Sequence, residues 1–469
     1  MKIEQIYTGC LAQGAYYIES EGEVAIIDPL REIQQYIDKA HSRNAKIKYI
    51  LETHFHADFV SGHIDLAKKT GAKIIFGPGA ETDYDIYSAK DGEELKLGKL
   101  TVKILHTPGH TLESTTYLLK DENGKDHAIF SGDTLFLGDV GRPDLAIKSD
   151  LTKEDLAGML FDSLRNKIMP LADDVVVYPA HGAGSACGKN LSKDTVGILG
   201  EQKKTNYALR EDMTKAEFIE EVLEGIAPPP QYFAKNAMMN KMGYDDFDSV
   251  LKTGNVPLDP EEFEAMANHE SALVLDVRPE TEYVKGHIPN SIFIGLNGSF
   301  APWVGALITD IKQPIVLVAP EGKSEEAVTR LSRVGYDNTL GYLKGGIDAW
   351  TNAGKDVATL ESISAEEFAN RVKKDKKVNI LDVRRDGEYQ SKHLEDAQHF
   401  SLDYINEKMN EIEKDKTYYV HCAGGYRSVI AASILKARGF DNLVDVAGGF
   451  GAIKKTDLAT TDFVCPSTL

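Results

Sequence analysis

The chain has 469 residues, a formal net charge of −20 and a pI near 5.1. Its length predicts about two to four domains, each large enough to bury a core of its own. The negative charge argues against nonspecific binding to nucleic acid or to an anionic membrane, so neither is predicted as a partner.

The N-terminus and the cysteines indicate the compartment. Residues 1–5 begin no basic segment followed by an apolar stretch, so no signal peptide is predicted, and no run approaches the length needed to cross a bilayer. The four cysteines are scattered and form no C-x-x-C pair, which argues against a disulfide framework. We therefore expect a cytoplasmic protein.

The first 200 or so residues alternate β-rich runs with helical stretches. Strands are predicted at 24–27, 47–53, 100–105, 115–119, 127–130 and 174–178. Residues 200–255, and 215–223 especially, read as amphipathic helices interrupted by prolines 228–230, and they predict closing helices and a linker. Polar residues gather just after strand ends, where α/β folds place their sites.

Four loops of this region carry histidine or aspartate beside glycine or proline. The first places three such side chains on alternate positions of an extended segment, so that they project to one side. The set consists of His54, His56, Asp58, His110, Asp133 and His181. A series of this kind predicts a metal site.

These loops resemble the metallo-β-lactamase superfamily, whose signature is H-x-H-x-D-H. The last histidine is missing, because Phe59 follows Asp58. In dinuclear members such as glyoxalase II that histidine helps hold the second metal, so Phe59 favours a single metal. The segment 138–144 also resembles the G-x-G-R-x-D stretch of persulfide dioxygenases, a mononuclear iron branch.

The resemblance implies a ligand set and its surroundings. The iron ligands would be His54, His110 and Asp133, with three open positions for O2 and substrate. His56, Asp58 and His181 would orient these ligands and bound water. Spacing alone leaves Zn open beside Fe(II), since both metals accept imidazole and carboxylate.

Two further residues of this region are candidates for contact with substrate. Arg142 could hold an anionic group, or it could form a structural salt bridge with Asp139 or Asp144. Cys187, six residues after His181, could line the metal pocket or be a small buried residue.

The last 200 or so residues contain an internal repeat. Residues 273–278 (LVLDVR) recur as 379–384 (NILDVR), about 105 positions later, and other matched segments agree with this shift. In the register set by residues 335–338 and 439–442, Cys422 falls opposite Val318 and Arg427 opposite Lys323. The second repeat therefore has a nucleophile that the first lacks.

The loop around Cys422 is predicted between a strand at 417–421 and a helix at 429–437. Gly424 and Gly425 would permit the unusual dihedrals that let backbone N–H groups surround one atom. Arg427 and the helix N-terminus would add positive potential, lower the pKa of the thiol and stabilise a persulfide. This pattern resembles the rhodanese family, and the first repeat resembles a catalytically silent copy.

The predicted fold is α/β: an αββα metallo-β-lactamase sandwich over residues 1–253, then rhodanese-like α/β domains over 254–357 and 358–469. This order resembles the persulfide dioxygenase–sulfurtransferase fusions. The resemblance implies that Fe(II) and O2 oxidise a low-molecular-weight thiol persulfide to sulfite. Cys422 would transfer a second sulfane sulfur to sulfite, giving thiosulfate, in a protein expected to be a homo-oligomer.

Two alternatives remain at this point. One is a glyoxalase II-like zinc thioester hydrolase fused to a rhodanese, with metal-bound hydroxide as the nucleophile. The other is a persulfide carrier or sensor that hands sulfur from Cys422 to a partner protein.

Overall fold

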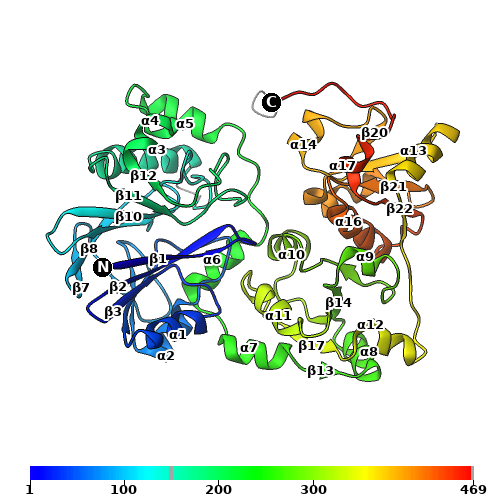
Figure 1. Ribbon diagram of the computed structural model, residues 1–469, viewed down its shortest axis with the longest axis horizontal. Coiled ribbons are helices and arrows are strands. Elements are labelled where there is room, and N and C mark those ends of the chain that lie inside the picture. The colour runs from blue at the N-terminus through cyan, green and yellow to red at the C-terminus, as the bar shows by residue number, and fades with distance from the viewer. Residues whose placement is uncertain (147–150, 376, 466–469) are drawn as a thin grey trace. The chain divides into compact units, whose positions relative to one another are not determined.

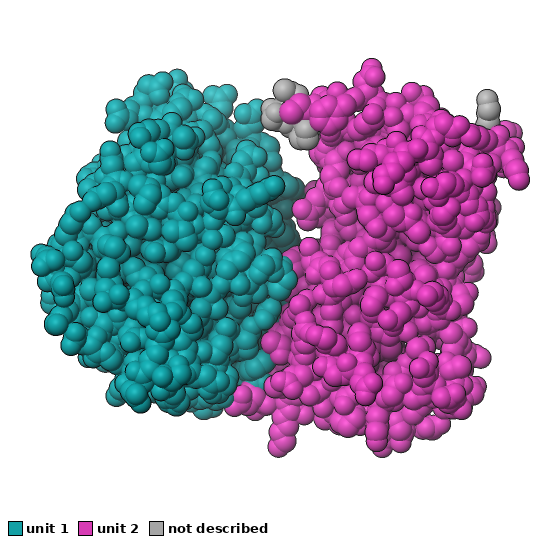
Figure 2. All heavy atoms as spheres, in the orientation of Figure 1, with its two compact units in different colours: residues 1–247, 332–335 teal, residues 248–331, 336–469 magenta. Residues whose placement is uncertain are grey.

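The computed structural model describes residues 1–146, 151–375 and 377–465 (Figure 1). The chain divides into two compact units, coloured separately in Figure 2. The first unit holds residues 1–247 and 332–335, and the second holds 248–331 and 336–469. Apart from residues 332–335, both sequence repeats lie in the second unit, so the predicted boundary at 357 stays a prediction.

The first unit contains two six-stranded sheets. One has the order β1 (Lys2–Thr8), β2 (Gln13–Ser20), β3 (Glu23–Ile27), β4 (Lys46–Leu51), β5 (Lys73–Phe76) and β6 (Tyr87–Ser88). The other has the order β12 (Gly197–Ile198), β11 (Val176–Pro179), β10 (Asp126–Gly132), β9 (Thr115–Lys120), β8 (Leu100–His106) and β7 (Glu94–Leu97). Each strand predicted from an apolar run in this region is present, with ends that move by one or two residues.

Both faces of each sheet are buried. On β3, Ala25 and Ile27 join a core shared by the two sheets, whereas Val24 and Ile26 join a core with helices α1 (Gln34–Ser42) and α2 (His63–Thr70). Successive side chains of a strand point to opposite faces, so a strand covered on both sides is a continuous apolar run. The second sheet is covered in the same way by α3 (Lys153–Ser163) and α5 (Lys215–Leu223). The predicted αββα sandwich is confirmed.

Helix α5 has the predicted bounds because local signals mark its start. The Thr214 hydroxyl accepts a hydrogen bond from the backbone N–H of Glu217, whose carboxylate accepts one from the N–H of Thr214. This capping box satisfies N–H groups that the first turn of a helix leaves unpaired. The other helical segments of this unit are η1 (Leu164–Ile168, a π-helix), α4 (Leu199–Thr205), η2 (Tyr207–Leu209) and α6 (Phe233–Met242).

The second unit contains two parallel five-stranded sheets, one for each repeat. The first has the order β13 (Pro257–Leu258), β17 (Thr339–Leu343), β16 (Ile315–Val318), β14 (Leu273–Asp276) and β15 (Ile292–Phe293). The second has the order β18 (Glu361–Ile363), β22 (Leu443–Val446), β21 (Tyr418–His421), β19 (Asn379–Asp382) and β20 (Ala397–His399). The two α/β domains predicted from the repeat are confirmed.

The helices of this unit follow the same repeat. In the first domain they are α7 (Phe247–Gly254), α8 (Pro260–His269), α9 (Glu280–Tyr283), α10 (Phe300–Leu307), α11 (Ser324–Ser332) and α12 (Gly346–Asn352). In the second they are α13 (Ala365–Lys374), α14 (Asp386–Ser391), η3 (Leu402–Tyr404), α15 (Ile405–Lys408), η4 (Met409–Glu411), α16 (Tyr426–Ala437) and α17 (Gly449–Ile453). Across the described residues, no helix combines the length and apolar character needed to span a membrane.

The strand pairing corrects the predicted register of the repeat. Asp276 of β14 pairs with Val318, and the equivalent Asp382 of β19 pairs with His421. Val318 is therefore the counterpart of His421, and Cys422 falls opposite Ala319 rather than Val318. The predicted register came from the turns after the helices, and it slips by one residue because the loop after β21 is longer than the loop after β16.

Candidate metal centre and Cys422 loop

The predicted metal-site residues meet in the first unit. Strand β4 leads into an irregular, buried loop that carries His54, His56 and Asp58, rather than the extended segment that was predicted. Potential ligand atoms of His54, His110 and Asp133 lie within 4.8 Å of one another, and so do those of His56, Asp58 and His181. The four loops therefore supply two neighbouring trios of buried side chains.

The first trio faces inward with its ligand atoms unpaired. His110 Nε2 lies 3.3 Å and His54 Nε2 lies 3.9 Å from Asp133 Oδ2, and all three residues are 1% exposed. Neither Nε2 atom nor either oxygen of Asp133 has a hydrogen-bond partner among the described residues. Buried polar atoms are costly to leave unpaired, so the two Nε2 atoms and Asp133 Oδ2 together fit a bound cation.

The opposite nitrogens of these rings are fixed by hydrogen bonds. His110 Nδ1 lies 2.9 Å from the carbonyl of Arg142, and His54 Nδ1 lies 3.0 Å from the hydroxyl of Thr53. The Thr53 hydroxyl donates in turn to Asp28, which leaves its lone pairs for the histidine. With the proton on Nδ1, each Nε2 presents a lone pair to the centre. Burial and the neighbouring imidazoles lower the pKa of His54 well below its usual value, which also favours the neutral ligand form.

Carboxylates lie close to both histidines of the second trio. His56 Nε2 lies 3.1 Å from Asp28 Oδ1, and Glu52 Oε2 lies 3.8 Å away. Although burial opposes it, this negative surrounding raises the pKa of His56 to about 9. His181 Nε2 lies 3.4 Å from Asp58 Oδ2 and 3.6 Å from Asp133 Oδ1. The division into ligands and orienting residues stays a prediction, because either trio has the chemistry of a metal site.

Phe59 occupies the position of the missing histidine and is fully buried. Its ring centroid lies 4.3 Å from that of His56. The backbone beside it is held by Asn240 of α6, whose amide donates 2.8 Å hydrogen bonds to the carbonyls of His56 and Phe59. Asn240 was not identified from the sequence, because nothing local relates this helix to a loop some 180 positions earlier.

Cys187 and Arg142 have different surroundings. Cys187 is 1% exposed, and its sulfur belongs to a cluster with Asp133 and His181, so it lies beside the metal site. The guanidinium of Arg142 makes two hydrogen bonds of 2.6 and 2.7 Å to Asp144. It donates two more to backbone carbonyls. This is the structural salt bridge considered above, with Asp144 rather than Asp139, and a role in binding substrate stays a prediction.

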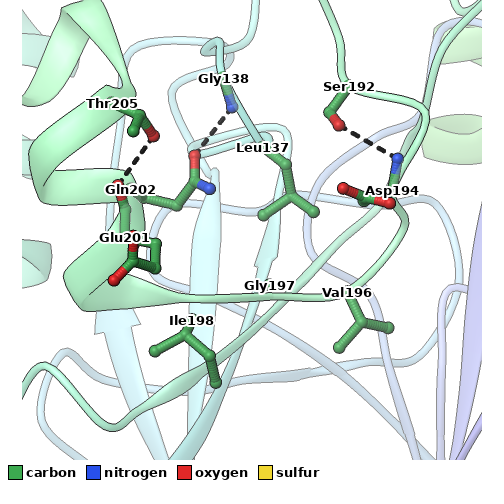
Figure 3. A pocket seen from close by; sticks show the side chains of 10 residues that line it. All are labelled: Leu137, Gly138, Ser192, Asp194, Val196, Gly197, Ile198, Glu201, Gln202 and Thr205. Carbon is green, nitrogen blue, oxygen red and sulfur yellow. Dashed lines mark hydrogen bonds between the residues drawn. The ribbon is translucent and has the colours of Figure 1, made fainter.

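A surface hollow of about 340 Å³ lies elsewhere in the first unit (Figure 3). Its lining comes from residues 137–138, from the stretch 192–198 and from helix α4, where Gln202 Oε1 accepts a hydrogen bond from the N–H of Gly138. None of the predicted metal-site residues lines it. The hollow therefore gives no support to a substrate site at this place.

In the Cys422 loop of the second unit one backbone N–H contacts the sulfur among the described residues, whereas several were predicted. The N–H of Gly425 donates a 3.1 Å hydrogen bond to Cys422 Sγ, and the thiol is 1% exposed. Gly425 has φ of 108° and is the N-cap of α16, which begins at Tyr426, three residues earlier than predicted. Gly424 does not have a positive φ, so only one of the two glycines supplies the unusual dihedral.

Arg427 lies in the first turn of α16, but its charge is paired. Glu388 of α14 accepts two hydrogen bonds of 2.6 and 2.8 Å from its guanidinium. Against the effect of burial, Arg427 holds the pKa of Glu388 below its usual value. The positive potential predicted at Cys422 is therefore partly neutralised. The sequence showed Glu388 only as a landmark of the repeat, shared with Glu282.

Two family descriptions match the chain. Residues 8–181 match "Metallo-beta-lactamase superfamily", and residues 259–353 and 364–456 each match "Rhodanese-like domain". All three matches fall inside the predicted domain spans.

Individual proteins resemble the first half of the chain in sequence. A probable hydroxyacylglutathione hydrolase of Schizosaccharomyces pombe is 32% identical over 160 residues, which is 34% of this chain and 58% of that protein. A hydroxyacylglutathione hydrolase of Rhodopseudomonas palustris is 30% identical over 234 residues, covering 44% of this chain and 86% of that protein. The chain thus spans little more than half of the yeast relative.

One solved structure is similar over most of the chain. A crystal structure of a metallo-β-lactamase from Staphylococcus aureus aligns with a TM-score of 0.64 and 32% identity. The alignment covers 73% of this chain and 98% of that one.

Proposed function

Because the chain belongs to the metallo-β-lactamase superfamily and carries two rhodanese-like domains, we propose that it is an enzyme of sulfane-sulfur oxidation and transfer. The first unit oxidises a low-molecular-weight thiol persulfide with O2: RSS⁻ + O2 + H2O → RS⁻ + SO3²⁻ + 2 H⁺. Cys422 then takes sulfane sulfur from a second persulfide and transfers it to sulfite, giving thiosulfate. One observation carries the proposal: a trio of two histidines and one carboxylate occurs in the same chain as a cysteine whose sulfur accepts a hydrogen bond from the N–H of Gly425.

The chain's own residues fit a single Fe(II) at the first trio. His54, His110 and Asp133 would hold it through unpaired buried atoms. Iron bound by two histidines and one carboxylate supplies O2 chemistry and leaves positions for substrate. His56, Asp58 and His181 would fix the orientation of the ligands from behind, in keeping with the contact of His56 with Asp28.

A second candidate is the thioester hydrolase, which the names of the sequence relatives favour. It would use the two trios together as a dinuclear zinc site that activates water. Phe59 speaks against it, because an apolar ring takes the place of a ligand to the second metal. The two candidates differ in metal content and in substrate.

Oxygen uptake with glutathione persulfide as the probe tests the proposal. The complete chain is purified without air and loaded with iron, and sulfite and thiosulfate are measured. We expect O2 uptake, and a Cys422→Ser variant should keep it while the product changes from thiosulfate to sulfite. No uptake by the iron-loaded protein would overturn the proposal. It would leave a persulfide carrier if Cys422 still gains sulfur, and a hydrolase if a zinc-loaded sample cleaves S-lactoylglutathione.

Phe59→His tests the metal count directly. The variant should bind a second equivalent of metal, measured by elemental analysis of dialysed protein, whereas the wild type and a Phe59→Leu control should bind one. Two equivalents in the wild type would favour the hydrolase.

A further inference from the structure

A chain of polar groups runs beneath the Cys422 loop, in which Cys422, Ser428 and Asp445 are buried and Ser362 is exposed. Cys422 Sγ lies 3.7 Å from the hydroxyl of Ser428, and that hydroxyl lies 2.7 Å from Asp445 Oδ1. The hydroxyl of Ser362 donates a 2.7 Å hydrogen bond to the other oxygen of Asp445. The nucleophile is thus connected to a carboxyl group through a single serine.

Asp445 is an unusual residue for its position. It lies on β22, between β18 and β21 in the sheet, is 2% exposed, and has Val444 and Val446 of the apolar core as its neighbours. Among the described residues, its hydrogen bonds come from two serines and no cation pairs with it. Burial raises the pKa of Asp445 to about 6. A carboxyl group that titrates near neutrality is well matched to accepting a proton there.

The silent repeat lacks this arrangement. Ser362 pairs with Asp445 between β18 and β22, and the same place between β13 and β17 is occupied by Pro257 and Tyr342. The carboxyl group and its serine are therefore absent from the repeat that has no thiol. If Asp445 and Ser362 only stabilised the fold, we would expect the same pair in both repeats.

We propose that Asp445 is a positioning residue for sulfur transfer that accepts, through the hydroxyl of Ser428, the proton that Cys422 loses. This inference rests on the proposed sulfurtransfer at Cys422. While Asp445 is ionised, the Ser428 hydroxyl donates to it in preference to the carbonyl of Gly425, 3.0 Å away, because the bond to a carboxylate is stronger. The serine oxygen then offers a lone pair to the thiol hydrogen.

The transfer step balances with a sulfane-sulfur donor such as thiosulfate. Cys422 Sγ forms a bond to the sulfane sulfur, and the S–S bond of the donor breaks, so that sulfite leaves with the electron pair. The thiol proton passes to Ser428, whose own proton passes to Asp445. The Ser428 hydroxyl then donates to the anionic persulfide, and the N–H of Gly425 continues to point at the sulfur that it contacts.

Other charged groups face this chain from neighbouring elements. Glu280 of α9 raises the pKa of Asp445 further. On the side of the thiol, Arg427 is paired with Glu388. His421, at the end of β21, is directed to Asp382 at 3.9 Å, and burial lowers its pKa. Arg427 and His421 are thus directed to other carboxylates. Asp445 is the carboxyl group that hydrogen bonds link to the sulfur, through Ser428.

Single-turnover release of sulfite from thiosulfate by the complete chain tests the relay. In the wild type we expect the rate to rise as Asp445 ionises, through pH about 6. Asp445→Asn keeps the shape of the side chain but cannot take the proton. The variant should lower the rate at neutral pH by roughly 100-fold and lose the rise in rate near pH 6. Ser428→Ala should behave in the same way.

Two further variants separate the relay from a structural effect. Ser362→Ala removes a hydrogen bond to the Asp445 carboxylate, so the rise in rate should move to higher pH. Ser324→Ala, at the equivalent of Ser428 in the first repeat, should leave the dependence of the rate on pH unchanged. A rise in the rate of sulfite release near pH 6 that persists in Asp445→Asn, or full activity of Ser428→Ala, would overturn the relay. Absence of sulfite release by the wild type would instead contradict the proposed function.

Discussion

The two repeats of the second unit share the same sheet order and matching side-chain pairs, and they differ where sulfur would be handled. Arg278 pairs with Asp276 at 2.6 Å, as Arg384 pairs with Asp382 at 2.5 Å. A tyrosine and a histidine four positions later also stack in both copies, with ring centroids 4.0 and 3.7 Å apart. Both repeats have these pairs, so their presence says nothing about activity.

The difference between the repeats lies in the loop and beneath it. From the strand end to the equivalent helix serine, Val318 to Ser324 is six positions and His421 to Ser428 is seven. The shorter loop also contains Pro320, which has no N–H to offer an anion. Loss of the thiol is therefore accompanied by loss of one loop residue, one donor and the carboxyl group below.

The largest effect is expected when the thiol is moved between repeats. Cys422→Ser should lower sulfur transfer from thiosulfate on the order of a thousandfold or more, because the serine hydroxyl cannot carry a persulfide. Adding Ala319→Cys to this variant puts a thiol at the equivalent place of the silent repeat. We expect no rescue, since the loop there is shorter. Restored transfer in the double variant would show that the thiol is the sole difference.

A pH-dependent contribution to stability should mark the second repeat. Because burial raises the pKa of Asp445 from 3.8 to about 6, its neutral form stabilises the fold below about pH 4, and this contribution is lost as pH rises through 6. The loss amounts to about 3 kcal/mol at most. Hydrogen exchange of β22 peptides at pH about 5 and about 7.5 measures it. Asp445→Asn should remove the pH dependence of this exchange, whereas Asp396→Asn, at an exposed position, should keep it. Equal pH dependence of the exchange in the two variants would contradict the assignment.

The first repeat also contacts the first residue of α16, after the Cys422 loop. The Tyr426 hydroxyl donates a 2.6 Å hydrogen bond to the carbonyl of Gly295, and a Cβ at Gly298 would lie 2.4 Å from the Tyr426 ring. Gly298→Ala should therefore cost about 1–3 kcal/mol of stability and slow sulfur transfer, because Tyr426 precedes Arg427. Chemical denaturation and the single-turnover assay measure the two effects. Gly387→Ala, which meets nothing within 4 Å, is the control; equal effects of both variants would argue against a supporting role.

The smallest expected change concerns the charge beside the thiol. Glu388→Gln removes the partner of Arg427, and the freed guanidinium should favour the thiolate of Cys422. Since Glu388 is partly exposed, we expect alkylation of Cys422 by iodoacetamide to become only about threefold faster. Peptide mass spectrometry gives the rate for this cysteine alone. Glu282→Gln, the counterpart in the silent repeat, should leave it unchanged, and a slower reaction in Glu388→Gln would contradict this view of the pair.

Much of the fold could be predicted because many strands and helices follow from patterns in a few neighbouring residues. Buried strands such as β3 are continuous apolar runs, and α5 begins at a capping box, so both are visible in a few neighbouring residues. The start of α16 was missed by three residues because it depends on the dihedrals of Gly425. Gly424, one position earlier, has the same identity but an ordinary φ.

The sequence by itself determined the two α/β repeats, the sandwich and the residue types of the site, since motif spacing and apolar periodicity are local properties. Only the tertiary structure decided that His54, His110 and Asp133 meet with unpaired atoms, that Glu388 neutralises Arg427 and that Asp445 lies under Cys422. It also decided the register, which sets Cys422 opposite Ala319. These facts depend on contacts between segments far apart in the chain, and hydrogen bonds and burial at such contacts leave no pattern in the neighbouring residues.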